Sequence, residues 1–470
     1  MTVEQDCIKI CALDLGDLSM ERLMDIPTSA ERKRVVVVGG GFAGLNFCKR
    51  LKDERFQIVL LDKTNHHNFQ PLLYQVATAG VEPSSISFPF RSLFAGRKNF
   101  HIRMCEVWET DAEAQEVKTS IGRLHYDYLV IATGCDTNYF GNKALEENTM
   151  ALKTTAEALY NRNHILESFE RAVDTDDPQE REKLLTFVVV GGGATGVELV
   201  GALAEMRRFV LRKDYPDLDL DKMRIILVDG KDRLLYSFKP KSSREAEDYL
   251  RYRGVELKQK TRVLGYENEV LRLSNEDIPT ANVFWTAGVI ANSMAGFSPD
   301  TYGHGNRLIV DEFNRVGGFK NVFALGDTAL MKQKDWPDGH PQVAQPAMQQ
   351  ADNCADNILA MENGEALNSF KYHDRGSMAT IGRNHAVVET KGLAFGGFLG
   401  WLVWLVIHLM NIVGFKNRLL IFIDWVWSYF THSSNLRIVV RPLIKGDRLY
   451  RLMKAQEQIR EQKYNKSDNS

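Results

Sequence analysis

The chain has 470 residues, enough for about three domains of ~150 residues each. Its 59 Lys and Arg residues against 61 Asp and Glu residues give a net charge of −2, so a nucleic-acid partner is not expected. Hydrophobic residues at 44% and charged residues at 26% exclude wholesale disorder, and six Cys residues are too few for a disulfide scaffold.

Residues 1–33 mix acidic, polar and apolar side chains, and we expect them to form an N-terminal extension. They lack the apolar core of a secretory signal, so the cysteines are expected to be free thiols in a reducing compartment.

The first motif follows a β-branched run, Val35–Val38, which has the pattern of a strand buried on both faces. Three glycines come next at G-x-G-x-x-G spacing: Gly39, Gly41 and Gly44. Such a turn lets a pyrophosphate approach the backbone and directs a helix N-terminus at it. A second strand, over 56–61, ends in Asp62, at the distance expected for a carboxylate that binds an adenosine ribose.

The same arrangement recurs after the strand Phe187–Val190, with glycines at the same spacing: Gly191, Gly193 and Gly196. The next strand ends in Asp229, 33 residues after the last glycine, so the intervening helix is predicted to continue through Arg208. A carboxylate at 229 would repel a ribose 2′-phosphate, which favours NADH over NADPH. The nearby Lys231 and Arg233 leave that preference open.

Two complete motifs predict two dinucleotides, most economically a resident FAD and an exchanging NADH. The alternative is a duplicated structural unit without cofactors. Further buried strands end in short turns at 128–134, 283–289 and 322–327, and the order of these landmarks resembles the two-dinucleotide-binding-domain flavoprotein superfamily. The resemblance implies that Asp327 holds the FAD ribitol and Asp62 its adenosine ribose. The predicted cofactor-binding residues are Gly39, Gly41, Phe42, Ala43, Gly44, Asp62, Lys63, Thr133, Gly134, Gly191, Gly193, Thr195, Gly196, Asp229, Ala287, Gly288, Gly326, Asp327 and Gln345.

The electron acceptor is not expected to be a dithiol, because the helix after the first motif contains only Cys48. Cys135 and Cys354 could meet in the fold, which keeps a sulfide:quinone oxidoreductase as an alternative function. No metal site is predicted.

Two segments, 67–77 and 344–350, resemble hallmark segments of the type II NADH:quinone oxidoreductases, single-subunit enzymes that do not pump protons. The resemblance covers roughly residues 34–445. It implies that Gln345 and Gln349 contact quinone, and that Glu198 lies near the nicotinamide and flavin; these three are the predicted catalytic residues. Their alternative roles are core amides for the glutamines and a helix-terminus acid for Glu198.

The region from Lys391 to Ser470 carries 12 basic and five acidic residues, which give it a net charge of +7. The other 390 residues carry a net charge of −9. Residues 392–415 lack charge, but the strongly apolar stretch, Trp401–Val413, would span only ~20 Å as a helix. A second apolar run follows at 419–430, and tryptophans crowd both runs. We expect two short helices lying in one leaflet, with a dimer interface as the alternative.

These observations predict an α/β fold with two Rossmann-like dinucleotide-binding domains, for FAD and NADH, and a C-terminal amphipathic helical membrane-binding segment. The FAD-binding domain is predicted to be split into two segments, 34–155 and 290–375, with the NADH-binding domain, 180–289, inserted between them after a linker at 156–179. The remaining divisions are the extension at 1–33, the membrane anchor at 376–445 and a tail at 446–470.

The predicted function is two-electron transfer from NADH through FAD to a membrane quinone, ubiquinone or menaquinone, without proton pumping. The enzyme is expected on the cytoplasmic face of a bacterial inner membrane, bound to the lipid surface as a homodimer. A nicotinamide-sensing flavoprotein without catalysis is the remaining alternative.

Overall fold

The computed structural model describes residues 22–27, 31–431 and 436–440. Most of the predicted N-terminal extension and the whole predicted tail, 446–470, lie outside the described residues.

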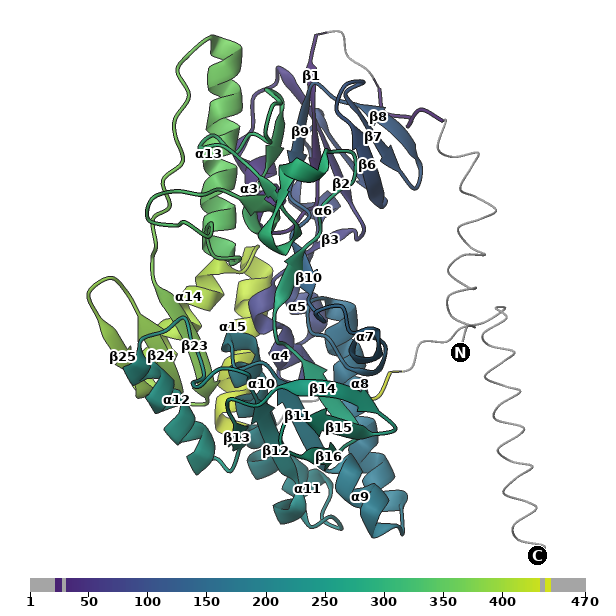
Figure 1. The fold of residues 1–470 in the computed structure, drawn as a ribbon, viewed down its shortest axis with the longest axis vertical. Coiled ribbons are helices and arrows are strands. Elements are labelled where there is room, and N and C mark those ends of the chain that lie inside the picture. The colour runs from purple at the N-terminus through teal and green to yellow at the C-terminus, as the bar shows by residue number, and fades with distance from the viewer. Residues whose placement is uncertain (1–21, 28–30, 432–435, 441–470) are drawn as a thin grey trace, which may run out of the picture.

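A parallel five-stranded sheet of order β21-β9-β1-β2-β5 forms the upper half of the molecule (Figure 1). Its strands are β1 (Lys33–Val38), β2 (Phe56–Asp62), β5 (Phe100–Met104), β9 (Tyr128–Ile131) and β21 (Val322–Ala324). Val35 and Val37 pack in one core with helices α3 (Phe42–Arg50) and α13 (Ala344–Asn363). Val36 and Val38 face a second core that includes the antiparallel strands β6 (Val107–Asp111), β7 (Glu116–Thr119) and β8 (Gly122–His125). The continuous valine run reflects this coverage of both faces.

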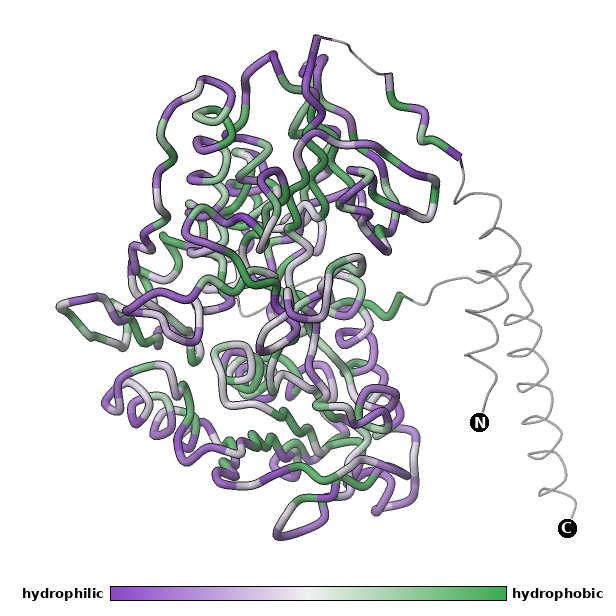
Figure 2. Tube along the Cα trace, turned by 45° about the horizontal axis from the view of Figure 1, so that its top comes forward, coloured by the Kyte–Doolittle hydropathy of each residue, from purple (hydrophilic) through white to green (hydrophobic). Residues whose placement is uncertain are grey.

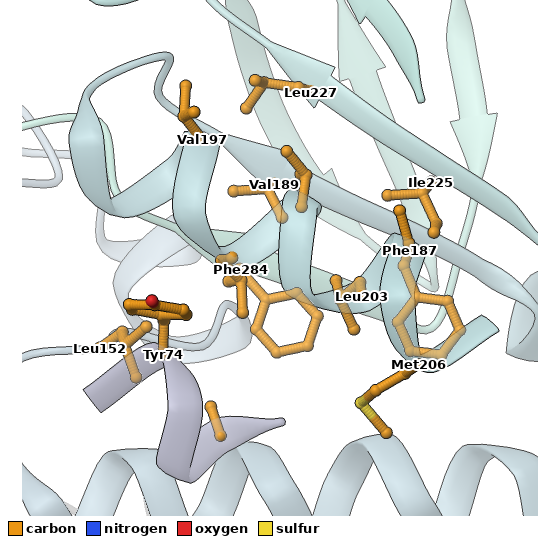
Figure 3. Packing of buried hydrophobic residues seen from close by; sticks show 14 of the residues in the cluster. Tyr74, Leu152, Phe187, Val189, Val197, Leu203, Met206, Ile225, Leu227 and Phe284 are labelled. Carbon is orange, nitrogen blue, oxygen red and sulfur yellow. The ribbon is translucent and has the colours of Figure 1, made fainter. Parts of the chain in front are cut away.

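The lower half repeats this design around a parallel four-stranded sheet of order β13-β12-β11-β17. Its strands are β11 (Thr186–Val190), β12 (Arg224–Val228), β13 (Glu256–Lys258) and β17 (Asn282–Trp285). Phe187, Val189 and Phe284 pack against helix α10 (Ala194–Glu205), as Figure 3 shows. The other face meets the antiparallel strands β14 (Val263–Glu267), β15 (Val270–Leu273) and β16 (Asp277–Pro279).

Helix α10 does not simply end at Glu205, because a π-helix, η2 (Met206–Leu211), continues it into α11 (Arg212–Asp214). The helical run therefore passes Arg208, as predicted, and extends further. The predicted linker is also largely helical: it contains most of α8 (Thr155–Asp174) and the start of α9 (Pro178–Leu184). A capping box between Thr154 and Glu157 begins α8, and its buried Ile165 and Phe169 pack in the same core as β11, so a charged stretch is ordered as helix.

Strand β10 (Cys135–Thr137) pairs antiparallel with β18 (Val289–Ala291) and connects the two halves directly after their turns. Shorter elements fill the connections: β3 (His66–Asn68), α4 (Leu73–Ala77), α5 (Pro83–Ile86), β4 (Ser87–Pro89), α6 (Phe90–Leu93), α7 (Lys143–Asn148), α12 (Pro240–Tyr252), β19 (Tyr302–Gly303), β20 (Arg307–Ile309) and β22 (Ala329–Leu330). Hydrophobic residues concentrate in the interior of both halves and hydrophilic residues at the periphery (Figure 2).

The C-terminal region forms an antiparallel sheet and two helices. The sheet consists of β23 (Ser377–Gly382), β24 (His385–Glu389) and β25 (Ala394–Gly396), and the helices are α14 (Gly397–Asn411) and α15 (Phe415–Thr431). Helix α14 begins four residues before the predicted apolar run, and Gly400 lets it approach β24 so closely that a Cβ there would lie 2.7 Å from the Ala386 carbonyl oxygen. Among the described residues, no helix is long and apolar enough to cross a membrane.

The outer faces of α14 and α15 carry exposed apolar side chains. On α14 these are Phe398, Leu399, Leu402, Val406, Ile407 and Met410, and on α15 they are Phe415, Leu419, Leu420, Phe422, Ile423, Val426, Trp427 and Phe430. An apolar surface of this extent marks an interaction site for a membrane or another protein.

Candidate active site

The first glycine turn leaves room for a ligand where a side chain would block it. Gly39 has φ +97°, and a Cβ on Gly44 would lie 1.8 Å from the Gly39 carbonyl oxygen, so both positions require glycine. Gly41 has open space around the position of a Cβ, and α3 begins after it without a side-chain cap. The free N–H groups of α3 are therefore available to a pyrophosphate, and Phe42, Ala43 and Gly44 form the first turn of that helix.

Asp62 is held against the same turn. One carboxylate oxygen accepts the Gly40 N–H at 2.6 Å, and the other accepts the Thr64 N–H at 2.7 Å. The neighbouring Lys63 is exposed and its Nζ lies 3.0 Å from Glu106. Asp62 thus sits at the end of β2 beside the turn, where a ribose would follow the pyrophosphate.

The second glycine turn reproduces these features. Gly191 has φ +113°, a Cβ on Gly196 would lie 1.9 Å from the Gly191 carbonyl oxygen, and Gly193 is open. Helix α10 begins after Gly193 without a side-chain cap, and Thr195 is exposed in its first turn. Asp229 accepts N–H groups from Gly192 and, at 2.6 Å, from Lys231. Both turns fit a dinucleotide by the same physical criterion, an uncapped helix N-terminus that the backbone leaves accessible.

The strand-end turns place several predicted residues together between the halves. Asp327 accepts the thiol proton of Cys135 at 2.9 Å, and Lys153 Nζ lies 3.2 Å from the same sulfur. The Thr133 hydroxyl lies 3.1 Å from that of Thr328, next to Asp327. Positive φ values are adopted by Gly134, Gly288 and Gly326, and Ala287 precedes Gly288.

Gln350, which was not predicted, accepts the Gly326 N–H at 2.7 Å and so supports the turn before Asp327. It directly follows Gln349, but its side chain is buried whereas that of Gln349 is partly exposed.

Gln345 and Gln349 both bind the backbone that leads into β23. The Gln345 amide pairs with Gly376 O at 2.9 Å and Arg375 N at 3.1 Å, and Gln349 pairs with both backbone groups of His373 at 3.0 Å. The two glutamines therefore anchor residues 373–376 to α13, and their predicted contact with quinone stays a prediction.

A separate pocket, here called the apolar cavity, lies where α4, α10, β23, α14 and α15 meet, and has a volume of about 160 Å³. Its lining includes Tyr74, Gln75, Glu198, Glu205, Met206, Phe209, Thr380, Arg383, Trp401, Trp404, Leu405, Trp425 and Tyr429. Most of the cavity wall consists of aromatic and aliphatic side chains, which suit a flat apolar ring. The wall also contains two carboxyl groups, which could supply protons to such a ring.

Glu198 is buried in the wall of this cavity and accepts the Thr380 N–H at 3.3 Å. Burial raises the pKa of Glu198 to about 8, so the carboxyl group holds a proton at neutral pH. Glu205, the last residue of α10, accepts the Arg383 N–H, and burial raises the pKa of Glu205 as well. A carboxyl group that is protonated at neutral pH can donate that proton to a bound acceptor.

Tyr74, Glu205 and Arg383 were not predicted as site residues. Tyr74 belongs to the 67–77 segment that signalled the family resemblance, and its pKa is raised by burial and by the charge of Glu198. Glu205 lies two turns beyond Glu198 on the same helix, a spacing that a search for acids on one helix face would have found. No pattern in the sequence indicates Arg383.

The sulfide alternative needed Cys135 and Cys354 to pair. Both are free thiols; Cys354 is buried in the core that α13 shares with α3, while Cys135 contacts Asp327 and Lys153 instead. Burial raises the pKa of the Cys135 thiol to about 12, so it is not a thiolate nucleophile.

Comparisons with known proteins agree with this geometry. The model of the pyridine nucleotide-disulphide oxidoreductase family matches residues 33–351, and that of the NDH2 C-terminal domain matches 374–432. The type II NADH:quinone oxidoreductase Ndh of Mycobacterium tuberculosis is 35% identical over 442 residues, which cover 90% of this chain and 93% of that protein. The type II NADH:quinone oxidoreductase of Staphylococcus aureus is 27% identical over 374 residues, covering 78% and 90%.

Solved structures show the same fold. The structure of NDH2 from Plasmodium falciparum in complex with NADH superposes with a TM-score of 0.79 at 20% identity and covers 87% of this chain and 100% of that one. A sulfide:quinone oxidoreductase from Aquifex aeolicus reaches a TM-score of 0.66 at 20% identity, covering 88% and 98%. These findings confirm the predicted α/β class and the predicted resemblance. The chain belongs to the pyridine nucleotide-disulphide oxidoreductase family and, within it, to the type II NADH:quinone oxidoreductases.

Proposed function

We propose that this protein is an FAD-dependent enzyme that oxidises NADH and reduces a membrane quinone without pumping protons. FAD, when bound, supplies the two-electron carrier between the nicotinamide and the quinone. The remaining tasks fall to the chain: it binds the two dinucleotides, places the quinone and supplies protons.

The main support for this proposal is the position of helix α10 between the second glycine turn and the apolar cavity. Its uncapped N-terminus, at Ala194, faces the turn that suits the NADH pyrophosphate. Glu198 lies four residues further on, about 6 Å along the helix axis at 1.5 Å per residue, and lines the apolar cavity. One helix therefore joins the NADH turn to a cavity that suits a quinone ring.

The aspartates at the strand ends support the assignment of the cofactors. Asp62 beside the first turn suits the adenosine ribose of FAD, and Asp327 suits the FAD ribitol. Asp229 beside the second turn suits the ribose of NADH and would repel a 2′-phosphate.

Proton supply to the quinone is the proposed role of Glu198. Reduction of a quinone to a quinol consumes two electrons and two protons, and a carboxyl group with a pKa of about 8 carries one of those protons at neutral pH. Gln345 and Gln349 bind the backbone just before β23, and Thr380 of that strand donates its N–H to Glu198. We therefore expect the two glutamines to influence quinone reduction through β23.

Attachment to lipid follows from the apolar faces of α14 and α15. Burying each exposed Leu, Ile or Phe contributes about 1.5–3 kcal/mol, so several of them suffice to hold the protein on a bilayer. A quinone dissolved in that bilayer would reach the cavity between these helices without crossing water. We assign the enzyme to the cytoplasmic face of a bacterial inner membrane, and the homodimer stays a prediction for light scattering to test.

The test is turnover of the purified protein with NADH and a short-chain quinone. We expect a flavin absorption spectrum that bleaches on addition of NADH, and rapid quinone reduction by wild type. Glu198→Ala should slow this turnover while the flavin stays bound, whereas the control Cys135→Ala/Cys354→Ala should keep most of it. Colourless protein that flavin cannot reconstitute, or bleaching without quinone turnover, would overturn the proposal; the latter result would favour the sensor.

Proton pumping is tested separately with the enzyme on sealed vesicles that contain a pH-sensitive dye. Turnover without acidification or alkalisation of the lumen is the expected outcome, and a gradient that an uncoupler abolishes would contradict it.

A further inference from the structure

A second cavity lies in the lower half of the molecule, at the opposite end of the β11–β12 sheet from the NADH turn. We call it the arginine-lined cavity; its volume is about 600 Å³. Its charged lining consists of Arg207, Arg208, Arg212, Arg224 and Arg253 with the carboxylates Asp221 and Glu256. Arg224 is the first residue of β12, whereas Asp229 follows its last, so the cavity is separated from the NADH turn by the length of the strand, roughly 16 Å.

The charges in the arginine-lined cavity are unbalanced. Five arginines and two carboxylates leave a formal charge of +3. Both carboxylates are occupied, because Asp221 pairs with Arg212 and Glu256 binds Arg224 through two bonds of 2.8 Å. Among the described residues, Arg207, Arg208 and Arg253 have no carboxylate within 4 Å. Three guanidinium groups thus line one space without an ion pair inside 4 Å in the described part of the chain, although Asp221 acts on Arg207 and Glu205 on Arg253 over longer distances.

The three guanidinium groups are not equivalent. Arg207 donates to the carbonyl oxygens of Met223 at 2.9 Å and Arg253 at 2.7 Å, so its N–H groups are occupied and it contributes mainly positive potential. Its pKa is lowered chiefly by burial and further by the positive charges of Arg212 and Arg253, while the Asp221 carboxylate raises it in part. An anion in the cavity would offset the remaining positive charge of its lining.

Arg208 and Arg253 are the two arginines whose guanidinium N–H groups can donate hydrogen bonds to a ligand in the cavity. Both guanidinium groups lie against the ring of Phe209, at 5.3 Å and 5.5 Å from its centroid. This stacking restricts two long side chains before any ligand arrives, which lowers the entropic cost of binding. Guanidinium groups bind phosphate oxygens through paired hydrogen bonds, and a phosphate is the anion that best matches several of them.

The backbone that presents Arg207 and Arg208 is the π-helix η2. π-helices are rare, cost stability relative to regular helix and occur frequently at functional sites. The cavity volume lies within the range of small-molecule sites, about 300–1,000 Å³.

We propose that the arginine-lined cavity is a binding site for a phosphate-bearing anion, distinct from the NADH turn, in which Arg208 and Arg253 bind the phosphate oxygens. A free phosphate compound and an anionic lipid headgroup share this chemistry. The proposal does not depend on the enzymatic reaction, because binding can be measured without turnover.

The test is calorimetric titration of the flavin-loaded protein with inorganic pyrophosphate, at saturating NAD⁺ so that the NADH turn is occupied. We expect saturable binding of one equivalent to wild type. Arg208→Gln/Arg253→Gln should weaken it about a hundred-fold, because each charged hydrogen bond contributes about ten-fold or more. The control Lys241→Gln/Arg244→Gln removes the same charge from exposed positions of α12 outside the cavity and should bind as wild type does.

A second titration, with short-chain phosphatidylglycerol below its micelle concentration, distinguishes the two sources. Binding of the lipid but not of pyrophosphate, lost in the same double variant, would support the site with a lipid headgroup as its ligand. The variant Arg208→Lys/Arg253→Lys keeps the charge but not the paired donors, and an intermediate affinity is expected. Failure of wild type to bind either compound, or equal binding by wild type and Arg208→Gln/Arg253→Gln with normal flavin content, would overturn the proposal.

Discussion

Replacing Glu198 by Gln is expected to remove a pH-dependent loss of stability from the folded protein. The pKa of Glu198 rises from 4.5 to about 8, chiefly because burial disfavours the charged carboxylate, and the residue is only 8% exposed. Between these two values the unfolded chain has released the proton and the folded chain retains it. The free energy of unfolding therefore falls by about 1.4 kcal/mol per pH unit from this group alone.

The sign of the effect determines the pH window. The stability associated with the neutral Glu198 carboxyl group is fully present below pH 4.5 and is lost as the pH rises through about 8, a total of roughly 5 kcal/mol. Gln has nearly the same shape and retains an oxygen that can accept the Thr380 N–H, but it cannot ionise. The variant should consequently gain stability over wild type as the pH increases through this window.

Thermal unfolding at constant ionic strength measures this gain. For 470 residues, an unfolding entropy of ~2.1 cal/mol/K per residue corresponds to roughly 1 kcal/mol per degree. The Tm of Glu198→Gln minus that of wild type should therefore increase by about 1.4 °C per pH unit, or about 4 °C between about pH 5 and 8. The control Glu147→Gln makes the same chemical change at an exposed position of α7 and should show a constant difference. A constant difference for Glu198→Gln as well would refute the conclusion that Glu198 keeps its proton in the folded protein.

Three further predictions concern the cofactor, the membrane and the core. Asp229→Gln should relax the preference for NADH over NADPH, measured as the ratio of kcat/KM values, and an unchanged ratio would place the adenosine ribose elsewhere. Phe422→Glu/Trp427→Glu, which alters side chains that are 51% and 63% exposed, should reduce partitioning onto anionic lipid vesicles at least about ten-fold while flavin stays bound; sedimentation as for wild type would argue against α15 as an anchor. Trp404→Ala should cost about 3–5 kcal/mol in the free energy of unfolding, because Trp404 is 1% exposed and its ring stacks on His408 at 4.0 Å; a loss below about 1 kcal/mol in denaturant titration would contradict this packing.

The glycine turns and their acids could be predicted because each depends on neighbours within one strand–turn–helix unit. Gly44 must be glycine because its own turn passes 1.8 Å from the position of a Cβ, and Asp62 binds the turn that its adjacent strand supports. The two apolar helices were likewise predicted from a local run of residues, although α14 starts earlier than the apolar pattern suggests. The hydrogen bonds of Gln345 and Gln349 could not be predicted in this way. Their partners lie in residues 373–376, and no local pattern identifies those partners.

The amino-acid sequence by itself determined the α/β class, the position of both dinucleotide turns and the presence of an apolar C-terminal pair of helices, because periodicity and glycine spacing act over a few residues. Only the tertiary structure decided that Tyr74, Glu198, Glu205 and Arg383 share one cavity, and that several arginines gather around another. These groups of the apolar cavity come from α4, α10 and the residue that follows β23, which are far apart in the sequence, and burial among distant elements is what raises the pKa values of Tyr74, Glu198 and Glu205. Proximity and desolvation are properties of the packed molecule, and no short stretch of chain encodes them alone.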